Sequence, residues 1–191
     1  MIKIRQKGDP VLSSDAKEVK RTMFGSPKLL KIVSDMKDAL ASQEDGVALA
    51  APQIGIPYRI FVISPRVLDL ITVINANKNI EKNGPREHKP YNWPTIFINP
   101  EITNASKRRR LADEGCLSLR NYYGKVKRFE KISIEAFDEQ GRRFRRGGSG
   151  LLAQIYQHEV DHLNGILFDQ KAEEFYYIPA EKRKISSPNK Q

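Results

Sequence analysis

The clearest hydrophobic pattern in the chain predicts a helix that begins directly after Ser26. Its apolar residues recur at i, i+4, i+7 and i+11, which places them on one helical stripe: Leu29, Val33, Met36 and Leu40. Ser26 is a good N-cap and Pro27 suits the first helical position, where no backbone N–H is needed. Gly46 is placed to end the helix. The pattern therefore predicts a core helix.

Short runs with the composition of β-strands occur elsewhere, at Arg59–Ser64, Thr72–Asn77, Thr95–Asn99, Lys131–Phe137 and Arg142–Arg146. The last two runs flank Asp138-Glu139-Gln140-Gly141, which is a turn signal, as is Gly8-Asp9-Pro10 near the N-terminus. Residues 64–94 are rich in Asn, Lys and Pro, and we interpret them as a surface excursion that could hold a short strand.

A second helix is predicted from Ser149-Gly150 to Gly165, with Leu151, Leu152, Ile155 and Leu163 as its apolar positions. The tail from Glu173 onward is basic and polar and is expected to be frayed. No internal repeat or linker divides the chain. The predicted fold class is therefore α+β: residues 1–191 as a single domain, with mostly antiparallel strands packed against two main helices.

Size and composition limit the class of protein. The 191 residues are enough for one domain with its own core. Mean hydropathy is −0.55, the apolar runs are too short to span a bilayer, and the N-terminal residues lack the pattern of a secretory signal. We expect a soluble cytoplasmic protein, or one of an organellar matrix if a transit peptide has been removed. No membrane or DNA partner is expected, and a monomer is favoured over a dimer.

The charge of the chain is strongly positive, with a net charge of +10 and a pI near 9.7. Arginines cluster at Arg108-Arg109-Arg110, at Arg142-Arg143 and at Arg145-Arg146. A solvated strand surface is the ordinary reading of such clusters. The alternative is contact with ribosomal RNA near the exit of the nascent chain, to which the basic tail would contribute.

The second predicted helix contains the only recognisable metal-binding pattern, His158-Glu159-Val160-Asp161-His162. Residues four apart lie on one helical face, so both imidazoles can reach a single ion. Glu159 stands beside the first histidine and can take a proton from a water at the metal. The alternative is a solvated helix face with two incidental histidines. Asp161 is predicted to point to another face.

A catalytic metal requires a third protein ligand and an open position. No further histidine follows His162 at the spacing of the zinc proteases, so the candidates are Glu173, Glu174 and the distant Cys116. Cys116 is the single cysteine, and on base rates such a thiol is more often buried filler than a ligand. A thiolate with two imidazoles nevertheless suits a divalent first-row metal.

Three segments in order resemble the motifs of the peptide deformylases: GVALAAPQ within Gly46–Gly55, EGCLS at Glu114–Ser118 and QHEVDH at Gln157–His162. GDPVL at Gly8–Leu12 resembles that family too, and the likeness extends over about residues 8–170. The resemblance implies an α+β fold with mostly antiparallel β-sheets around a central HExxH helix, which presents its histidines beside the cysteine-bearing strand. It also implies hydrolysis of the N-formyl group from the formyl-methionine of newly made polypeptides, with release of formate.

The resemblance also assigns roles to residues. Cys116, His158 and His162 would hold one divalent ion, natively Fe²⁺, for which Zn²⁺, Ni²⁺ or Co²⁺ can substitute. Glu159 would move the proton. The Gln53 amide and the Leu117 backbone N–H would donate to the formyl oxygen. The substrate peptide would lie along the strand of Gly46, Val47 and Ala48.

Three departures from the family pattern touch the substrate pocket. Ala48 stands where the family usually has Gly, which adds a methyl group where the peptide should pass. Gln154, one turn before His158, replaces an apolar residue, either as a substrate contact or as a polar rim residue bonded to backbone. The family's proline after the cysteine motif is missing. Glu114 could orient Arg128 or a metal ligand, but an ordinary surface carboxylate paired with an arginine is the favoured interpretation.

Two other functions remain open on the sequence. The chain could be a catalytically weak or altered-specificity relative that acts as a metal-containing peptide- or ribosome-binding module, as Ala48 and Gln154 suggest. It could also be a zinc endopeptidase of the HExxH type, which would take a downstream ligand in place of Cys116.

Overall fold

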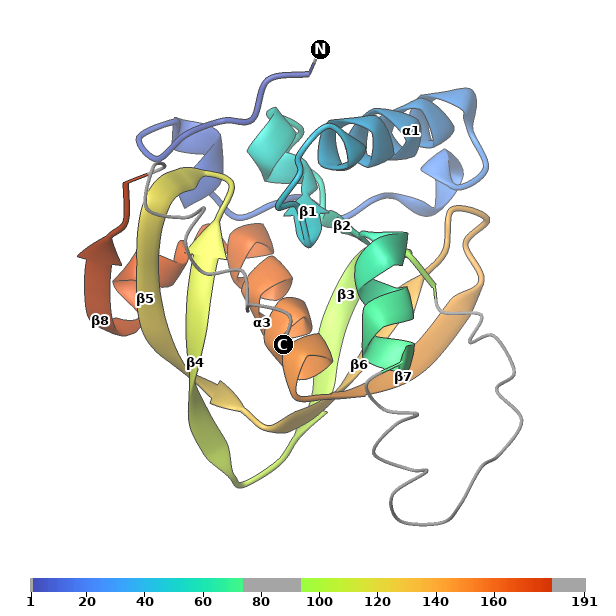
Figure 1. Ribbon diagram of the computed structural model, residues 1–191. Coiled ribbons are helices and arrows are strands. Elements are labelled where there is room, and N and C mark those ends of the chain that lie inside the picture. Colours follow the sequence, from blue (N-terminus) through green and yellow to red (C-terminus); the bar gives the residue numbers. More distant parts are fainter. Residues whose placement is uncertain (1, 74–93, 180–191) are drawn as a thin grey trace.

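The computed structural model describes residues 2–73 and 94–179. Figure 1 shows its helices and strands, and their bounds in chain order are η1 Pro10–Ser13, η2 Arg21–Met23, α1 Pro27–Ala41, β1 Ala48–Ala50, η3 Ala51–Ile54, β2 Ile60–Ile63, β3 Ile96–Ala105, β4 Arg109–Cys116, β5 Leu119–Phe129, β6 Lys131–Phe137, β7 Arg143–Ser149, α3 Leu151–Leu163, η4 Phe168–Gln170 and β8 Ala172–Tyr177.

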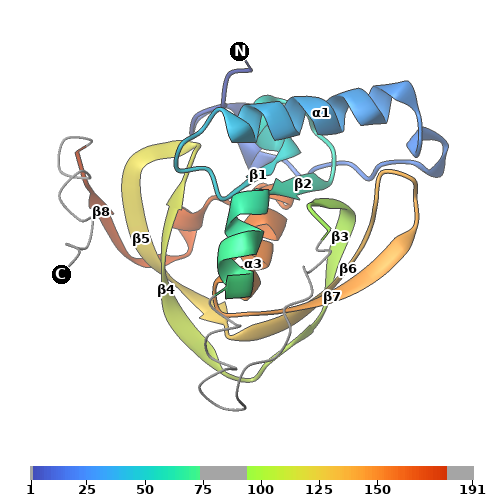
Figure 2. The same ribbon diagram turned by 45° about the vertical axis from the view of Figure 1, so that its right-hand side comes forward.

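The described strands form two antiparallel sheets, one with the order β1-β2-β3-β6-β7 and one with the order β4-β5-β8. The two views in Figures 1 and 2 place α3 between the sheets, with α1 on the far side of β1 and β2. The predicted fold class is confirmed: the protein is α+β, with mostly antiparallel sheets around the helix that carries the HExxH pattern. No helix in the described ranges is long and apolar enough to cross a membrane.

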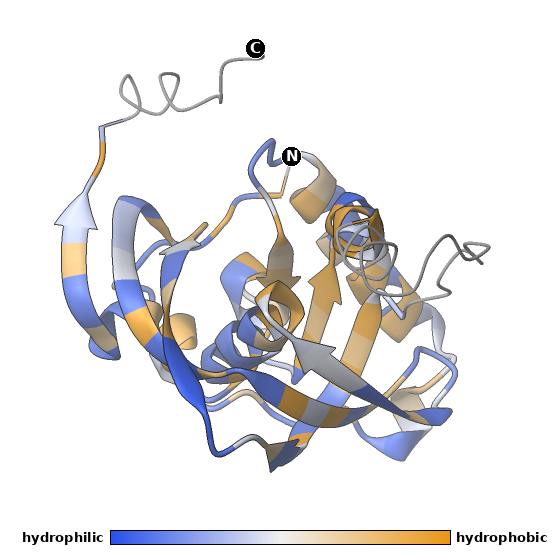
Figure 3. Ribbon diagram, turned by 60° about the horizontal axis from the view of Figure 1, so that its bottom comes forward, coloured by the Kyte–Doolittle hydropathy of each residue, from blue (hydrophilic) through white to orange (hydrophobic). Residues whose placement is uncertain are grey.

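Two apolar clusters hold the helices to the large sheet. Buried residues of α3, such as Tyr156, pack with Phe61 and Phe97 on one face, and the α1 stripe packs with Leu49, Val62 and other residues on the opposite face. Figure 3 shows the hydrophobic residues gathered toward the middle of the molecule. Helix α3 covers one face of the large sheet and α1 covers the other. The position of α3 is therefore determined by its packing against the sheet along the whole length of the helix.

The start of α1 is as predicted, but its end is not. Ser26 Oγ accepts from the Leu29 N–H at 3.3 Å, which caps the helix. The helix ends at Ala41 rather than near Gly46, because Ser42 Oγ donates to the Ala39 carbonyl at 2.7 Å and satisfies a carbonyl of the last turn.

Two predictions of irregular or extended structure were wrong. Residues 65–73 are helical. Where the structure describes these residues, the predictions of a strand at Thr72–Asn77 and of a surface excursion at 64–94 are therefore wrong. Leu68 and Ile71 are buried in the core of the large sheet, and their spacing of three is helical rather than alternating. The rest of that excursion, residues 74–93, lies outside the described residues.

The predicted frayed tail was also wrong over the part that the structure describes. Residues Ala172–Tyr177 form β8, which pairs with β5. Aromatic side chains stabilise this pairing: the rings of Tyr122 and Phe175 stack with centroids 5.1 Å apart. Residues 180–191 lie outside the described residues. The strand pair of β4 and β5 was not predicted, since these polar runs lack a simple alternation of apolar and polar residues.

Candidate metal centre and active site

Helix α3 and the end of β4 bring three potential metal ligands together. The ligand atoms of Cys116, His158 and His162 all lie within 4.8 Å of one another, and Cys116 Sγ is 3.2 Å from His162 Nε2. The two imidazoles come from successive turns of α3, and their ring centroids are 4.9 Å apart. Cys116 is distant from the two histidines in sequence but lies near them because β4 ends over α3. A β-bulge between Gly115 and Cys116 marks this end of the strand.

A buried carboxylate orients His158. Glu114 Oε2 lies 2.9 Å from His158 Nδ1. Burial opposes the ionisation of Glu114, but the Arg128 guanidinium and His158 outweigh it and hold the pKa of Glu114 at about 2. An ionised carboxylate only accepts hydrogen bonds, so Nδ1 carries the proton and Nε2 faces the cluster as the ligand atom.

Behind Glu114 lies a buried network of charges. Arg128 donates to both Glu114 oxygens at 2.7 and 2.9 Å, and to Asp161 Oδ2 at 2.5 Å. Lys171 Nζ donates to Asp161 Oδ1 at 2.5 Å. The expectation of a surface pair for Glu114 was therefore wrong, because strand alternation turns Glu114 and Arg128 toward α3, where both are about 4% exposed. Asp161 is bonded to Arg128 and Lys171 and is not among the three potential metal ligands of the described residues.

We expect Arg128→Leu to lower the free energy of unfolding by about 3 kcal/mol, because it leaves Glu114 buried without its guanidinium partner. Arg110→Leu is the matched control: Arg110 is the cross-strand partner of Arg128 but is exposed, and its loss should change stability by less than about 0.5 kcal/mol. Urea unfolding of the three proteins measures the difference. Equal destabilisation by both substitutions would show that the buried network contributes no more than a surface charge.

The ionisation of the cluster follows from its neighbours. Burial raises the pKa of the Cys116 thiol, but the nearby imidazoles of His162 and His158 more than offset this effect and bring the pKa well below its usual range. Burial also lowers the pKa of His158, and contacts with Cys116 and Glu114 reverse the shift to well above the usual value. Burial raises the pKa of the Glu159 carboxyl to about 7.

Gln53 lies beside the cluster in a fixed orientation. Its Oε1 accepts from the Ala50 backbone N–H at 2.8 Å, so its Nε2 faces Ser118 Oγ at 3.1 Å and Cys116 Sγ at 3.4 Å. Because an N–H can only donate, the oxygen must face Ala50 and the amide nitrogen must face the site. The short η3 helix, which begins with Ala51-Pro52, places Gln53 at this point.

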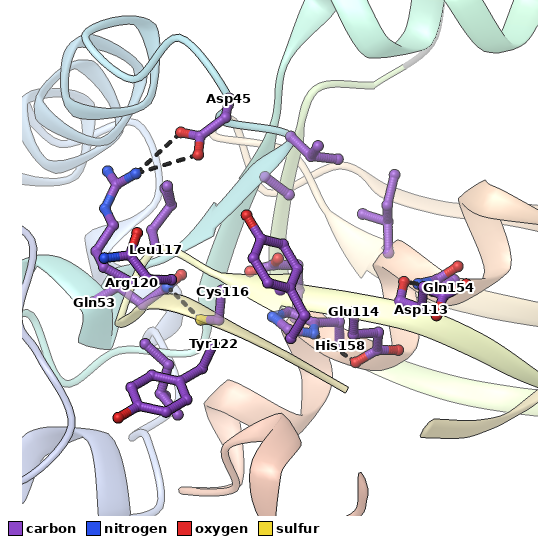
Figure 4. A pocket seen from close by; sticks show the side chains of 18 of the residues that line it. Asp45, Gln53, Asp113, Glu114, Cys116, Leu117, Arg120, Tyr122, Gln154 and His158 are labelled. Carbon is purple, nitrogen blue, oxygen red and sulfur yellow. Dashed lines mark hydrogen bonds and ion pairs between the residues drawn. The ribbon is translucent and has the colours of Figure 1, made fainter. Parts of the chain in front are cut away.

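These residues line one pocket of about 270 Å³ between β1, β4, β5 and α3 (Figure 4). Its lining includes most residues that the sequence predicted for the site: Val47, Ala48, Gln53, Cys116, Leu117, Gln154, His158 and Glu159. His162 is buried beneath it, at 1% exposed, and Gly46 is not among its lining residues. Figure 4 shows Gln53, Arg120 and Tyr122 on one side of the cluster and Gln154 with Asp113 on the other.

Two of the departures from the family pattern, Gln154 and Ala48, have clear contacts in the structure. Gln154 Nε2 donates to the Asp113 carbonyl at 2.7 Å, which ties α3 to β4 at the pocket rim. Ala48 is 8% exposed, and its methyl group packs in the core of the large sheet while also lining the pocket. Two neighbours of the site were not predicted: Ser118, which lies in the EGCLS motif but was given no role, and Tyr123, whose segment carries no distinctive pattern.

The donor set fits a divalent first-row metal. It offers one thiolate and two imidazoles, with one His158 nitrogen already committed to Glu114. Within the described ranges this is the sole group of three such side chains. Glu174 instead pairs with Lys125 at 2.8 Å on β8, so the downstream carboxylate ligand expected of an endopeptidase is not found at the site. Glu159 Oε2 is buried without a hydrogen-bond partner among the residues described, as expected of an atom that faces a reactant.

Comparison with known proteins identifies the family. The model of the polypeptide deformylase family matches residues 1–176. The chain belongs to the polypeptide deformylases. This match confirms the resemblance inferred from the three motifs. The protein is a member of this hydrolase family, and it carries a Cys-His-His cluster.

Individual peptide deformylases are similar to the chain over most of its length. The enzyme of Heliobacterium modesticaldum is 39% identical over 170 residues, which cover 89% of this chain and 93% of that protein. The Met-Ala-Ser-bound class I type b peptide deformylase of Acinetobacter baumannii has a TM-score of 0.70 and 29% identity, over 90% of this chain and 98% of that one. The peptide deformylase of Synechococcus elongatus in complex with actinonin has a TM-score of 0.72 and 33% identity, over 91% and 79% of the two chains.

Proposed function

We propose that this peptide deformylase removes the N-formyl group from the formyl-methionine of newly made polypeptides and releases formate. The observation that carries the proposal is that Cys116 and His158 line the pocket together with the buried carboxylate of Glu159, and that the buried His162 completes the cluster of three ligand atoms. The A. baumannii relative that binds Met-Ala-Ser supports a peptide of this kind as the ligand.

Cys116, His158 and His162 would hold one divalent ion per chain, natively Fe²⁺, with Zn²⁺, Ni²⁺ or Co²⁺ as substitutes. When bound, such an ion supplies Lewis-acid chemistry, which polarises a carbonyl and makes a water more acidic. The hydrogen bond from His158 Nδ1 to Glu114 keeps the imidazole in the tautomer and orientation that ligation requires.

Glu159 would accept the proton of the attacking water and pass it to the leaving amine. Charge then grows on the formyl oxygen. The Gln53 amide nitrogen and the Leu117 backbone N–H would donate to that oxygen, and Gln53 is already held in place by Ala50. A donor that needs no reorientation stabilises the transition state more than it stabilises the substrate.

The substrate backbone would pair with the chain segment of Gly46, Val47 and Ala48. β1 is the edge strand of the large sheet and its outer edge faces the pocket, so its backbone groups can pair with an extended peptide. Pairing through the main chain tolerates varied sequences, as an enzyme acting on many polypeptides requires. The methyl group of Ala48 narrows the space beside β1 that the substrate backbone would occupy, although that methyl group is mostly covered by core residues.

Gln154→Leu should raise kcat/KM for formyl-Met-Ala-Ser by about tenfold, because the leucine removes polar amide atoms from the wall beside a thioether side chain. The same variant should lose activity on formyl-Gln-Ala-Ser, whose amide can pair with Gln154 in the native pocket. Steady-state rates with the two peptides give the selectivity ratio. An unchanged ratio would mean that Gln154 serves only to tie α3 to the Asp113 carbonyl.

We further propose a monomer that works in the cytoplasm or an organellar matrix and contacts ribosomal RNA. Arg109, Arg110 and Arg145 are exposed on the strand surfaces, whereas Arg142 and Arg143 pair with Asp138 and Glu135. Binding through phosphates weakens steeply as salt rises. Co-sedimentation with ribosomes that does not respond to salt would therefore contradict this contact.

Formate release from formyl-Met-Ala-Ser by iron- or nickel-loaded protein tests the main proposal. The expected result is turnover that depends on the metal. A protein that binds the metal and the peptide without turnover would instead be the binding module that Ala48 and Gln154 suggested.

A further inference from the structure

The chain before η1 contacts the two residues to which the proposed function assigns the formyl oxygen, Gln53 and Leu117. Residues 4–7 lie outside the helices and strands, yet their polar groups bond to the segments that carry these two donors. The donors are far apart in sequence, since Gln53 belongs to η3 and Leu117 follows β4. A segment that bonds both of them can therefore hold them at a constant distance from each other.

Arg5 holds the main chain of η3. Its backbone N–H donates to the Gln53 carbonyl at 2.7 Å. Its guanidinium lies over Gly55, the residue that ends η3, so closely that a Cβ atom there would come within 2.9 Å of Arg5 Nε. The guanidinium also pairs with Asp9 at 3.6 Å. Because Ala50 orients the amide of Gln53, both the main chain and the side chain of this residue are held.

Gln6 and Lys7 hold the segment of the second donor. Gln6 Nε2 donates to the Leu117 carbonyl at 3.1 Å, and its other hydrogen can serve the Ile4 carbonyl at 3.3 Å. The Lys7 N–H donates to the Ser118 carbonyl at 2.9 Å. Two successive carbonyls are thus bonded, so the rigid peptide planes on both sides of Ser118 are fixed in orientation.

One of these two peptide planes also reaches Cys116. The plane that carries the Leu117 carbonyl carries the Ser118 N–H as well, and this N–H donates to Cys116 Sγ at 3.4 Å. Hydrogen bonds at the two ends of one peptide unit strengthen each other. Loss of the bond from Gln6 would therefore loosen the Ser118 N–H and free the backbone of Leu117, whose own N–H is the proposed donor.

The segment is itself anchored on both sides. Ile4 is 8% exposed and packs in the same apolar cluster as Ile54 and Leu117. Lys7 Nζ pairs with Asp169 of η4, the short helix that follows α3. A segment near a chain end frays unless it is tied down. These two anchors keep the hydrogen bonds to Gln53, Leu117 and Ser118 in place.

We propose that residues 5–7 position the two donors to the formyl oxygen, and that the Gln6 side chain is the group that fixes Leu117. The inference rests on the proposed function. None of residues 5–7 is among the residues that line the pocket, so they act through Gln53 and Leu117 rather than on the substrate. Preorganised donors accelerate a reaction because they need no reorientation as charge develops on the oxygen. A loosened donor therefore lowers kcat more than it weakens substrate binding.

Gln6→Leu tests the side-chain bond, since Gln6 is exposed and the leucine has a similar size but no donor. The kcat for formyl-Met-Ala-Ser should fall about three- to tenfold, while KM and the affinity for the product Met-Ala-Ser stay within about twofold. Gln6→Lys keeps an N–H donor at a similar reach and should restore most of kcat. Gln140→Leu is the matched control, because Gln140 is an exposed glutamine at the turn between β6 and β7, and it should leave kcat unchanged.

Hydrogen exchange of the Ser118 amide is a second measurement, which needs neither turnover nor a bound metal. This amide shares a peptide plane with the carbonyl that Gln6 holds and is bonded to Cys116 Sγ. It should exchange about three- to tenfold faster in Gln6→Leu than in the wild type, and at the wild-type rate in Gln6→Lys and Gln140→Leu.

The outcomes separate this inference from the proposed function. No formate release by the wild-type protein sinks the proposed function, while the exchange rates of the Ser118 amide still decide whether Gln6 holds this segment. An equal fall in kcat in Gln6→Leu and Gln6→Lys, or an exchange rate that Gln6→Leu does not change, overturns the positioning role. A lower free energy of unfolding in Gln6→Leu with an unchanged kcat would make Gln6 a merely structural residue and would also overturn it.

Discussion

Glu159→Gln is expected to lower the turnover of formyl-Met-Ala-Ser by about 10²- to 10⁴-fold, while the protein still binds one metal ion per chain. The carboxylate is 4% exposed and lines the pocket beside His158, whereas Glu114, the other buried carboxylate of the pocket, is bonded to Arg128 and His158. Glutamine has nearly the same shape but cannot accept and return a proton. Formate release and metal content, measured on the same preparation, test both parts of the expectation.

The matched control is Glu173→Gln, an exposed carboxylate on β8, which should leave turnover unchanged. Full activity of Glu159→Gln would remove this residue from the proposed mechanism. A loss of metal together with activity would assign it a structural role at the centre instead of proton transfer.

Cys116→Ala is expected to weaken metal binding by at least about 100-fold and to abolish turnover, since it leaves two imidazoles and no thiolate. Cys116 Sγ lies 3.2 Å from His162 Nε2, and the residue is held at the β-bulge at the end of β4. Metal analysis after dialysis against a weak chelator gives the affinity change.

Ser118→Ala is the control for a local packing effect, because Ser118 is buried next to the same cysteine and contacts Gln53 without offering a metal ligand. It should keep the full metal content. Unaltered metal content in Cys116→Ala would show that Cys116 is not a metal ligand.

Much of the fold was predictable where local chemistry and periodicity agree. The start of α1 at Ser26-Pro27, the strand Lys131–Phe137 and the helix that ends before Gly165 all follow from caps, alternation and glycine placement. The prediction failed for elements whose structure depends on pairing with distant segments of the chain. Strand β8 was predicted as a frayed tail because its polar residues, such as Glu173 and Glu174, gain order only from pairing with β5.

The residues of the candidate site likewise fall into those that local patterns predicted and those that only long-range packing brings together. That His158 and His162 share one helical face could be read from the sequence alone, because the period of a helix is a local property. The three motifs also indicated the family, which the family model confirms, and the resemblance predicted Cys116 and Gln53 as further site residues.

The contacts that join distant segments could not be predicted and became visible only in the folded chain. The fold placed Glu114 between His158 and Arg128 rather than on the surface, it turned the Gln53 amide toward Cys116, and it set Gln6 beside the Leu117 carbonyl. The physical reason is that burial and side-chain partners depend on which strands and helices pack together. Those choices are made by the whole core, and no short stretch of residues encodes them.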